Sequence, residues 1–183
     1  REIVTTTRLP DGQRLTFDFS FTDRGTVIQL DSTLELDQDH AARHFVTKGR
    51  TYRVFPADSE VTVTGRRAQV RDASRETIID IRWRPFFPVD NYAPIGVHER
   101  LIRYWLEHKR PAEILAPPAG VIRITSRGIG PAPGRLPGRR WERLAIEGAS
   151  SAEAPIAVRT MAATQPPTVA PTVAPTEPTT ADA

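Results

Sequence analysis

The chain has 183 residues, with 25 lysines and arginines against 22 aspartates and glutamates, which gives a formal net charge of +3. Because cysteine is absent, a disulfide framework, a thiolate metal site and a thiol nucleophile are all excluded. Basic residues are spread among acidic ones, so a mixed, solvated surface is favoured over a nucleic-acid-binding face. No apolar run approaches the ~18 residues that a membrane-spanning helix needs, so we expect no membrane span.

A change in composition after Gly148 divides the chain into a folded domain, residues 1–148, and a tail, residues 149–183. The tail contains TQPPTVAPTVAPTEPTT (164–180), which lacks aromatic residues and repeats proline, threonine and alanine. This composition predicts a disordered or extended polyproline segment. Two interpretations of the tail stay open: a linker or stalk of an exported protein, or an end that does not belong to the fold.

Apolar and polar residues alternate along most of the domain, which is typical of strands that are buried on one face. The clearest case is RLTFDFSFTD, in which Phe17, Phe19 and Phe21 share one face and predict the centre of the core. Turn signals such as Pro10-Asp11-Gly12 separate the strands. The expected strands are residues 1–9, 14–23, 26–37, 42–55, 59–72 (a hairpin around Gly65), 77–88, 121–128 and 139–148.

One segment has a helical period instead. Val97, Leu101 and Trp105 recur at every fourth position, opposite charged residues, which predicts an amphipathic helix over about residues 94–108. Asp90 or Asn91 is expected to cap it. The predicted fold class is therefore mainly β (α+β): a curved antiparallel meander sheet or partial barrel of about eight or nine strands, plugged by this one helix.

Few residue patterns indicate chemistry. His40 and His44 have the spacing of two metal ligands on a helix, but on a strand four residues span roughly 13 Å, too far for one small ion. Carboxylates such as Asp37 and Asp39 are interpreted as outward charges rather than as an acid/base pair. The serines lack the context of a nucleophile, and no glycine-rich phosphate loop is present. We therefore expect no catalytic residue, no metal ion and no cofactor.

Aromatic and apolar residues supply the candidate site instead. The segment DNYAP (90–94) is not required by the fold, so Tyr92 either contacts a ligand or packs under the helix. The arginines beside Trp141 in GRLPGRRW (134–141) suit a phosphate or an unstacked base, although a solvated loop is favoured. The candidate ligand-binding residues, which would line a space between sheet and helix, are Phe17, Phe19, Phe21, Trp83, Tyr92, Leu101 and Trp105.

Several stretches together resemble the amino-terminal β domain that precedes the catalytic barrel of some exported bacterial amidohydrolases. They are FDFSFTDRG (17–25), KGRTYRVFPADSEVTVTGRRAQV (48–70), FFPVDNYAPIGVHERLIRYWLEHKRPAEIL (86–115) and IRITSRG…RRWERLAIEG (122–148). The resemblance implies that metal ligands and catalytic acids lie in the barrel, and it assigns no functional residue to this chain. The proline-rich tail stands where that barrel would begin.

Two functions are expected from the sequence, and an enzyme in its own right is disfavoured. The first is a non-catalytic accessory β domain of an amidohydrolase-like exported protein, with a structural or substrate-access role and a catalytic domain as its partner. The alternative is a stand-alone periplasmic binding module for an apolar or lipid-like ligand. Both place the protein in the bacterial periplasm or outside the cell. Because the chain begins at Arg1 without an apolar leader, we expect a processed chain or part of a longer one.

Overall fold

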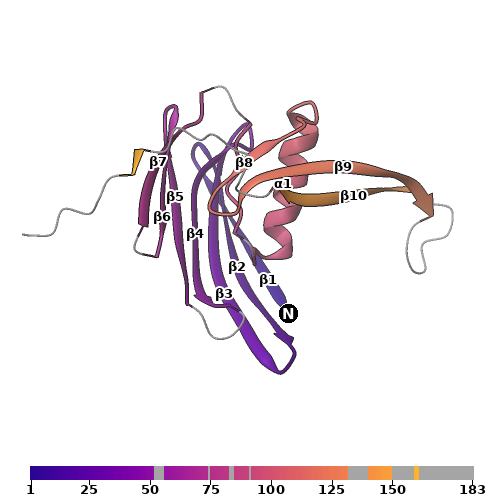
Figure 1. Ribbon diagram of the computed structural model, residues 1–183, viewed down its shortest axis with the longest axis horizontal. Coiled ribbons are helices and arrows are strands. Elements are labelled where there is room, and N and C mark those ends of the chain that lie inside the picture. Colours follow the sequence, from indigo (N-terminus) through magenta and orange to yellow (C-terminus); the bar gives the residue numbers. More distant parts are fainter. Residues whose placement is uncertain are drawn as a thin grey trace, which may run out of the picture.

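The computed structural model describes residues 1–51, 56–73, 75–82, 85–90, 92–131, 140–149 and 159–160. Seven strands form one antiparallel sheet in the order of the chain, with a short eighth strand paired to the last of them. A second sheet of three strands and one helix lie beside it (Figure 1). The seven strands of the first sheet are β1 (Glu2–Leu9), β2 (Gly12–Asp23), β3 (Thr26–Asp37), β4 (Ala42–Arg50), β5 (Pro56–Thr64), β6 (Arg67–Asp72) and β7 (Arg75–Asp80).

The alternation of apolar and polar residues sets the register of this sheet. Leu15 on β2 lies opposite Leu34 on β3, and Leu34 lies opposite Phe45 on β4, so a buried row crosses the strands. The residues between them face the other side, which we call the outer face. The mainly β, antiparallel character that the sequence predicted is confirmed, and so is the hairpin of β2 and β3.

Helix α1 (Ile95–Glu107) packs against the inner face of the sheet. Val97, Leu101, Tyr104 and Trp105 are its buried residues, so the predicted stripe is confirmed and gains a tyrosine. The expected cap is wrong for Asp90, whose Oδ2 instead accepts a hydrogen bond from the Ser59 hydroxyl at 3.0 Å. Asn91 lies outside the described residues.

The cap of α1 comes from the start of the chain. Glu2 Oε1 accepts a hydrogen bond from the Gly96 backbone N–H at 2.8 Å, and no side chain at the helix N-terminus itself forms a cap. A carboxylate at this end also interacts favourably with the helix dipole. The close approach of α1 to the sheet needs a glycine, since a Cβ on Gly96 would lie 2.7 Å from Cε1 of Phe17. β1 therefore fixes the start of the helix.

The prediction of one continuous sheet or partial barrel is wrong, because the strands divide into two sheets. The strand expected over residues 77–88 ends with β7 at Asp80, and Phe86 and Val89 make only single bridges to Leu115 and Pro118. Pro85 and Pro88, which lack the N–H group that a ladder needs, interrupt the strand. Among the described residues β1 and β7 do not pair, so the sheet stays open and no barrel closes.

The second sheet adds a strand that the sequence pattern did not reveal. It consists of β10 (Arg140–Ala149), β9 (Gly120–Pro131) and the short β8 (Ile114–Ala116), in that spatial order. Ile114, Leu115, Ile122 and Ile124 join the core under α1. A two-residue strand, β11 (Arg159–Thr160), pairs with β7, and the remaining residues of the expected tail lie outside the described part of the chain.

Candidate functional site

The predicted ligand-binding residues fall into two groups. Phe17, Leu101 and Trp105 are buried in the core between the sheet and α1. Phe19 is half-buried and Phe21 is 38% exposed, because the hairpin of β2 and β3 extends past the start of the helix (Figure 1). Tyr92 is also exposed, and Trp83 lies outside the described residues. The set therefore does not line a common space: three of its six described members are packed in the core, Phe19 is half-buried, and Phe21 and Tyr92 are exposed.

A cavity does occur at one end of the sandwich of sheet and helix. It has a volume of about 550 Å³ and opens to solvent between the turn after β3, the turn after β5 and the last part of α1. We call it the end cavity. Apolar side chains make up much of its wall, with Asp37 and Arg43 at the polar side; the apolar ones are Ala42, Val63, Ile81, Phe86 and Tyr104.

Tyr104 anchors the wall of the end cavity. Its hydroxyl oxygen accepts a hydrogen bond from the Phe86 backbone N–H at 3.1 Å, and its ring is stacked on that of His108 with centroids 3.9 Å apart. Burial raises the pKa of the Tyr104 phenol above its usual value. The phenol therefore stays protonated at neutral pH and can hold the chain of Phe86 in place, but it is not prepared to act as a base.

The two histidines with metal-like spacing bond to different partners. His40 Nδ1 lies 3.2 Å from Glu107 at the end of α1, whereas His44 Nε2 lies 2.9 Å from Glu60 on the outer face of the sheet. Within the described ranges, no group of three or more His, Asp or Glu side chains is placed to hold a metal ion. The sequence interpretation of His40 and His44 as separate surface residues agrees with this geometry.

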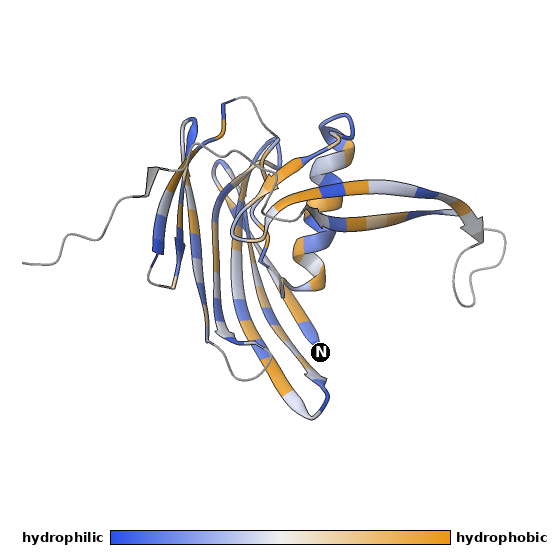
Figure 2. Ribbon diagram, in the orientation of Figure 1, coloured by the Kyte–Doolittle hydropathy of each residue, from blue (hydrophilic) through white to orange (hydrophobic). Residues whose placement is uncertain are grey.

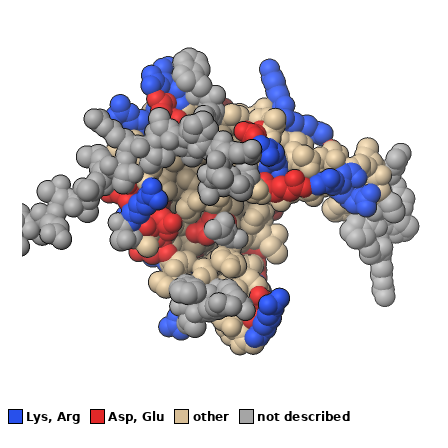
Figure 3. All heavy atoms as spheres, viewed as in Figure 1, with Lys and Arg blue, Asp and Glu red and all other residues tan. Residues whose placement is uncertain are grey.

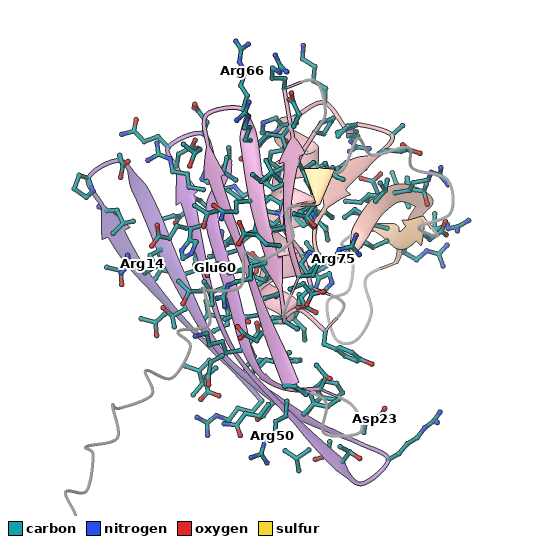
Figure 4. The ribbon with its side chains drawn as sticks, turned by 60° about the vertical axis from the view of Figure 1, so that its left-hand side comes forward. Arg14, Asp23, Arg50, Glu60, Arg66 and Arg75 are labelled. Carbon is teal, nitrogen blue, oxygen red and sulfur yellow. The ribbon has the colours of Figure 1, made fainter. Side chains whose placement is uncertain are left out.

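Charged side chains on the outer face are paired with one another. Glu60 accepts hydrogen bonds from His44 and, at 2.7 Å, from Arg71, and these two bonds lower the pKa of its carboxyl group. Arg14 bonds to Glu35 at 2.8 Å in the same way. Figure 4 shows this face, with Glu60 near its middle and Arg14 toward β1. The lowered pKa of Glu60 suits a solvated surface charge rather than a general acid.

A long two-stranded hairpin is the feature that departs most from a packed domain. β8 pairs with residues 120–122, and beyond that point β10 is the one strand that pairs with β9 among the residues that the structure describes. We call residues 123–130 and 141–148 the arm; it projects away from the first sheet (Figure 1). Apolar residues are interspersed with polar ones along it (Figure 2). Ile129 is 60% exposed, Trp141 47% and Ile146 37%.

The arm is held to the segment after α1 by a contact near its far end, because Glu142, which lies opposite Ile129, bonds to Arg110. Both guanidinium nitrogens Nη1 and Nη2 of Arg110 bond to the carboxylate of Glu142, at 3.0 and 3.2 Å, and the same guanidinium lies over the ring of Trp105. Hydrogen bonds from Ser126 and then Arg110 lower the pKa of Glu142. Ion pairs of Arg127 with Glu147 and of Arg123 with Glu113 place opposite charges side by side along the arm (Figure 3). Ile124 and Leu144 of the arm pack on the core, whereas Ile129, Trp141 and Ile146 stay exposed.

Sequence reasoning predicted the two strands of the arm but not its projection from the body. The one available signal was the apolar pair Ile129 and Trp141 beside a glycine- and proline-rich loop, a pattern that a buried hairpin shares. No helix in the described residues is long and apolar enough to cross a membrane. Comparisons with protein-family models, with curated proteins and with solved structures gave no match.

Proposed function

We propose that this chain is a non-catalytic accessory β domain of an exported, amidohydrolase-like protein, and that the arm is the element that docks on the catalytic barrel. The observation that carries the proposal is the arm itself, whose residues Ile129, Trp141 and Ile146 are exposed on a hairpin beside which the described part of the chain places no third strand. The packed inner face and the paired carboxylates of the outer face suit a supporting role.

Physical chemistry favours a partner for such an arm. A single two-stranded hairpin is marginally stable in water, because each strand has one neighbour and neither face is covered. The arm exposes apolar side chains, and tryptophan is among the residues that are enriched at the centre of protein interfaces. Its alternating charges would form the polar rim. A barrel domain that covers the face of the arm carrying Trp141 would stabilise the hairpin and orient the accessory domain.

The proposal is tested by the affinity of the full chain for a catalytic barrel domain of the amidohydrolase type from the same genome, measured by isothermal titration calorimetry. Replacing both Ile129 and Trp141 by aspartate should weaken binding by roughly 2 kcal/mol or more, which is about 30-fold in Kd. The matched control is Val27→Asp, because Val27 is 61% exposed on the hairpin of β2 and β3, far from the arm along the chain. Equal losses in both variants, or no binding by the unmodified chain, would refute the proposal.

A second candidate function is supported by the end cavity. Its volume of about 550 Å³ falls within the range of small-molecule sites, and its wall combines apolar side chains with a few polar groups. The ligand would be apolar or lipid-like and would sit against Ala42, Val63 and Tyr104 instead of the inner-face residues expected from the sequence.

Native mass spectrometry of the full chain recovered from a bacterial periplasm separates the two functions. The binding module should carry an apolar molecule that is lost on denaturing extraction, and Val63→Trp, which fills the cavity from its wall, should abolish this occupancy. A chain that carries no ligand and keeps its affinity for the barrel leaves the accessory role as the function.

A further inference from the structure

The free edge of β1 is unusual among the strands of this protein. β1 lies at the margin of the first sheet, and residues 3–8 are exposed (Figure 4). Between Glu2 and Arg8 the strand reads Ile-Val-Thr-Thr-Thr, with high strand propensity, no charge and no proline. Its pairing with β2 runs without a bulge from Glu2 to Leu9. Exposed edges of this kind form templates for a further strand.

Two other strands at the margins of the sheets, β7 and β10, carry features that oppose pairing. β7, at the far margin, is joined by β11 and has the charged residues Arg75, Glu76 and Asp80. β10 is an edge strand as well, but its register shifts between Glu142 and Leu144 and charged residues recur along it. Bulges and charges are the usual protection of edge strands. β1 lacks both over five consecutive residues.

The pairing of β1 with β2 fixes which backbone groups are free. Arg1 and Ser20 exchange both of their backbone hydrogen bonds, at 2.6 and 2.8 Å. In an antiparallel ladder such pairs alternate with pairs that do not bond, so Ile3, Thr5 and Thr7 bond to β2. The N–H and C=O groups that point away from the sheet therefore belong to the residues between them: Glu2, Val4, Thr6 and Arg8.

We propose that β1 pairs antiparallel with β1 of a second copy of this chain, about a two-fold axis at Thr5. In this register Val4 lies opposite Thr6 of the other copy and Glu2 opposite Arg8, so every outward backbone group meets another outward group. Ile3 lies opposite Thr7, and the two Thr5 residues face each other in a non-bonded pair. The proposal is independent of the docking role of the arm.

Charge complementarity selects this register and a second copy as the occupant. Each end of the joint ladder places a carboxylate opposite a guanidinium, and opposite charges on facing strand residues stabilise a pair. Glu2 Oε1 accepts the Gly96 N–H, which leaves Oε2 for Arg8 of the other copy. Shifting the register by two residues separates Glu2 from Arg8 and shortens the ladder. A two-fold arrangement uses the same patch on both copies, as isologous dimers do.

A single introduced cysteine tests the register, because the protein has none of its own. In Thr5→Cys the two Cα atoms would face each other at about 4.5 Å, which is within the range that a disulfide bridges. Air oxidation should convert this variant to a covalent dimer with twice the 20.4 kDa mass of one chain. The control Thr7→Cys should stay uncrosslinked, since its two sulfurs would be separated by about 13 Å along the strands.

Sedimentation equilibrium of the cysteine-free full chain gives the independent measurement. The chain should sediment as a dimer, and Thr6→Pro should shift it to the monomer mass, because proline removes an outward N–H that β2 does not use. Val4→Lys, which adds a charge to the free edge without changing the backbone, should produce the same shift. A monomeric unmodified chain, a dimer that survives both substitutions, or equal crosslinking of Thr5→Cys and Thr7→Cys would overturn the proposal.

Discussion

Replacing Trp105 by alanine should lower the free energy of unfolding by about 3–5 kcal/mol, the cost of truncating a large buried aromatic side chain. Trp105 is 3% exposed, and its Nε1–H donates a hydrogen bond to the Pro111 carbonyl oxygen at 3.0 Å. Its removal would leave a cavity between α1 and the core and would release Arg110, which lies over the ring. Urea denaturation of the purified full chain measures the change.

The neighbouring residue supplies the control for this substitution. Leu106 belongs to the same helix but is 47% exposed, so Leu106→Ala removes little buried surface while it changes helix propensity only slightly. Its cost should stay below about 1 kcal/mol. Similar losses for Trp105→Ala and Leu106→Ala would mean that α1 does not pack on the sheet by the face described above.

Gly96→Ala should destabilise the protein by about 1–3 kcal/mol, the range for overpacking a core. In most helices the same change stabilises by roughly 0.5–1 kcal/mol, because alanine has the higher helix propensity. Here the added Cβ would lie 2.7 Å from the buried ring of Phe17 and 3.1 Å from Oε1 of Glu2. The new methyl group would therefore push α1 away from the sheet and weaken the hydrogen bond from Gly96 to Glu2.

A double-mutant cycle tests whether the ring of Phe17 is the cause. Phe17→Leu removes the ring edge nearest to Gly96, so Gly96→Ala should cost less in that background than in the unmodified chain. Urea denaturation of the four proteins gives their free energies of unfolding, and the differences between these give the interaction free energy. If Gly96→Ala stabilises the unmodified chain, or costs the same in both backgrounds, the close approach of α1 to β2 is wrong.

Local patterns predicted those parts of the fold whose structure depends on neighbouring residues. The alternation in β2 and β3 identified which residues face inward, and the four-residue repeat of Val97, Leu101 and Trp105 placed α1 to within one residue at each end. Both patterns arise from the geometry of the elements themselves, so they can be recognised without tertiary information. Proline and glycine signals located most turns for the same reason.

Long-range contacts were beyond the reach of such patterns. The cap of α1 comes from Glu2, which is 94 residues from Gly96 in the chain, so no local rule could find it. β8 is three residues long and becomes a strand through its pairing with β9. Phe17 is buried and Phe21 is exposed although the alternation puts both on the same face of β2. The difference depends on where the helix begins above the sheet.

The candidate site was less predictable than the fold. The aromatic residues that suggested a ligand-lined space are, for Phe17 and Trp105, core residues, because a sequence does not distinguish a packed aromatic from one that lines a cavity. The arm could be predicted as two strands, but its exposure depends on the end of β8 and on the absence of a third strand beyond residue 122 in the described part of the second sheet. Exposure of Trp141 is therefore a tertiary property.

Hydrogen exchange of the full chain, followed by mass spectrometry with and without the catalytic barrel domain, tests the docking role of the arm most directly. For the chain alone, amides around Ile129 and Trp141 in the far part of the arm should exchange much faster than those of β2, β3 and β4, since the apolar side chains there are exposed. Addition of the barrel should slow exchange in the arm and leave the turn between β2 and β3 unchanged. Protection that spares the arm, or an arm already as protected as β3 in the free chain, would contradict the account.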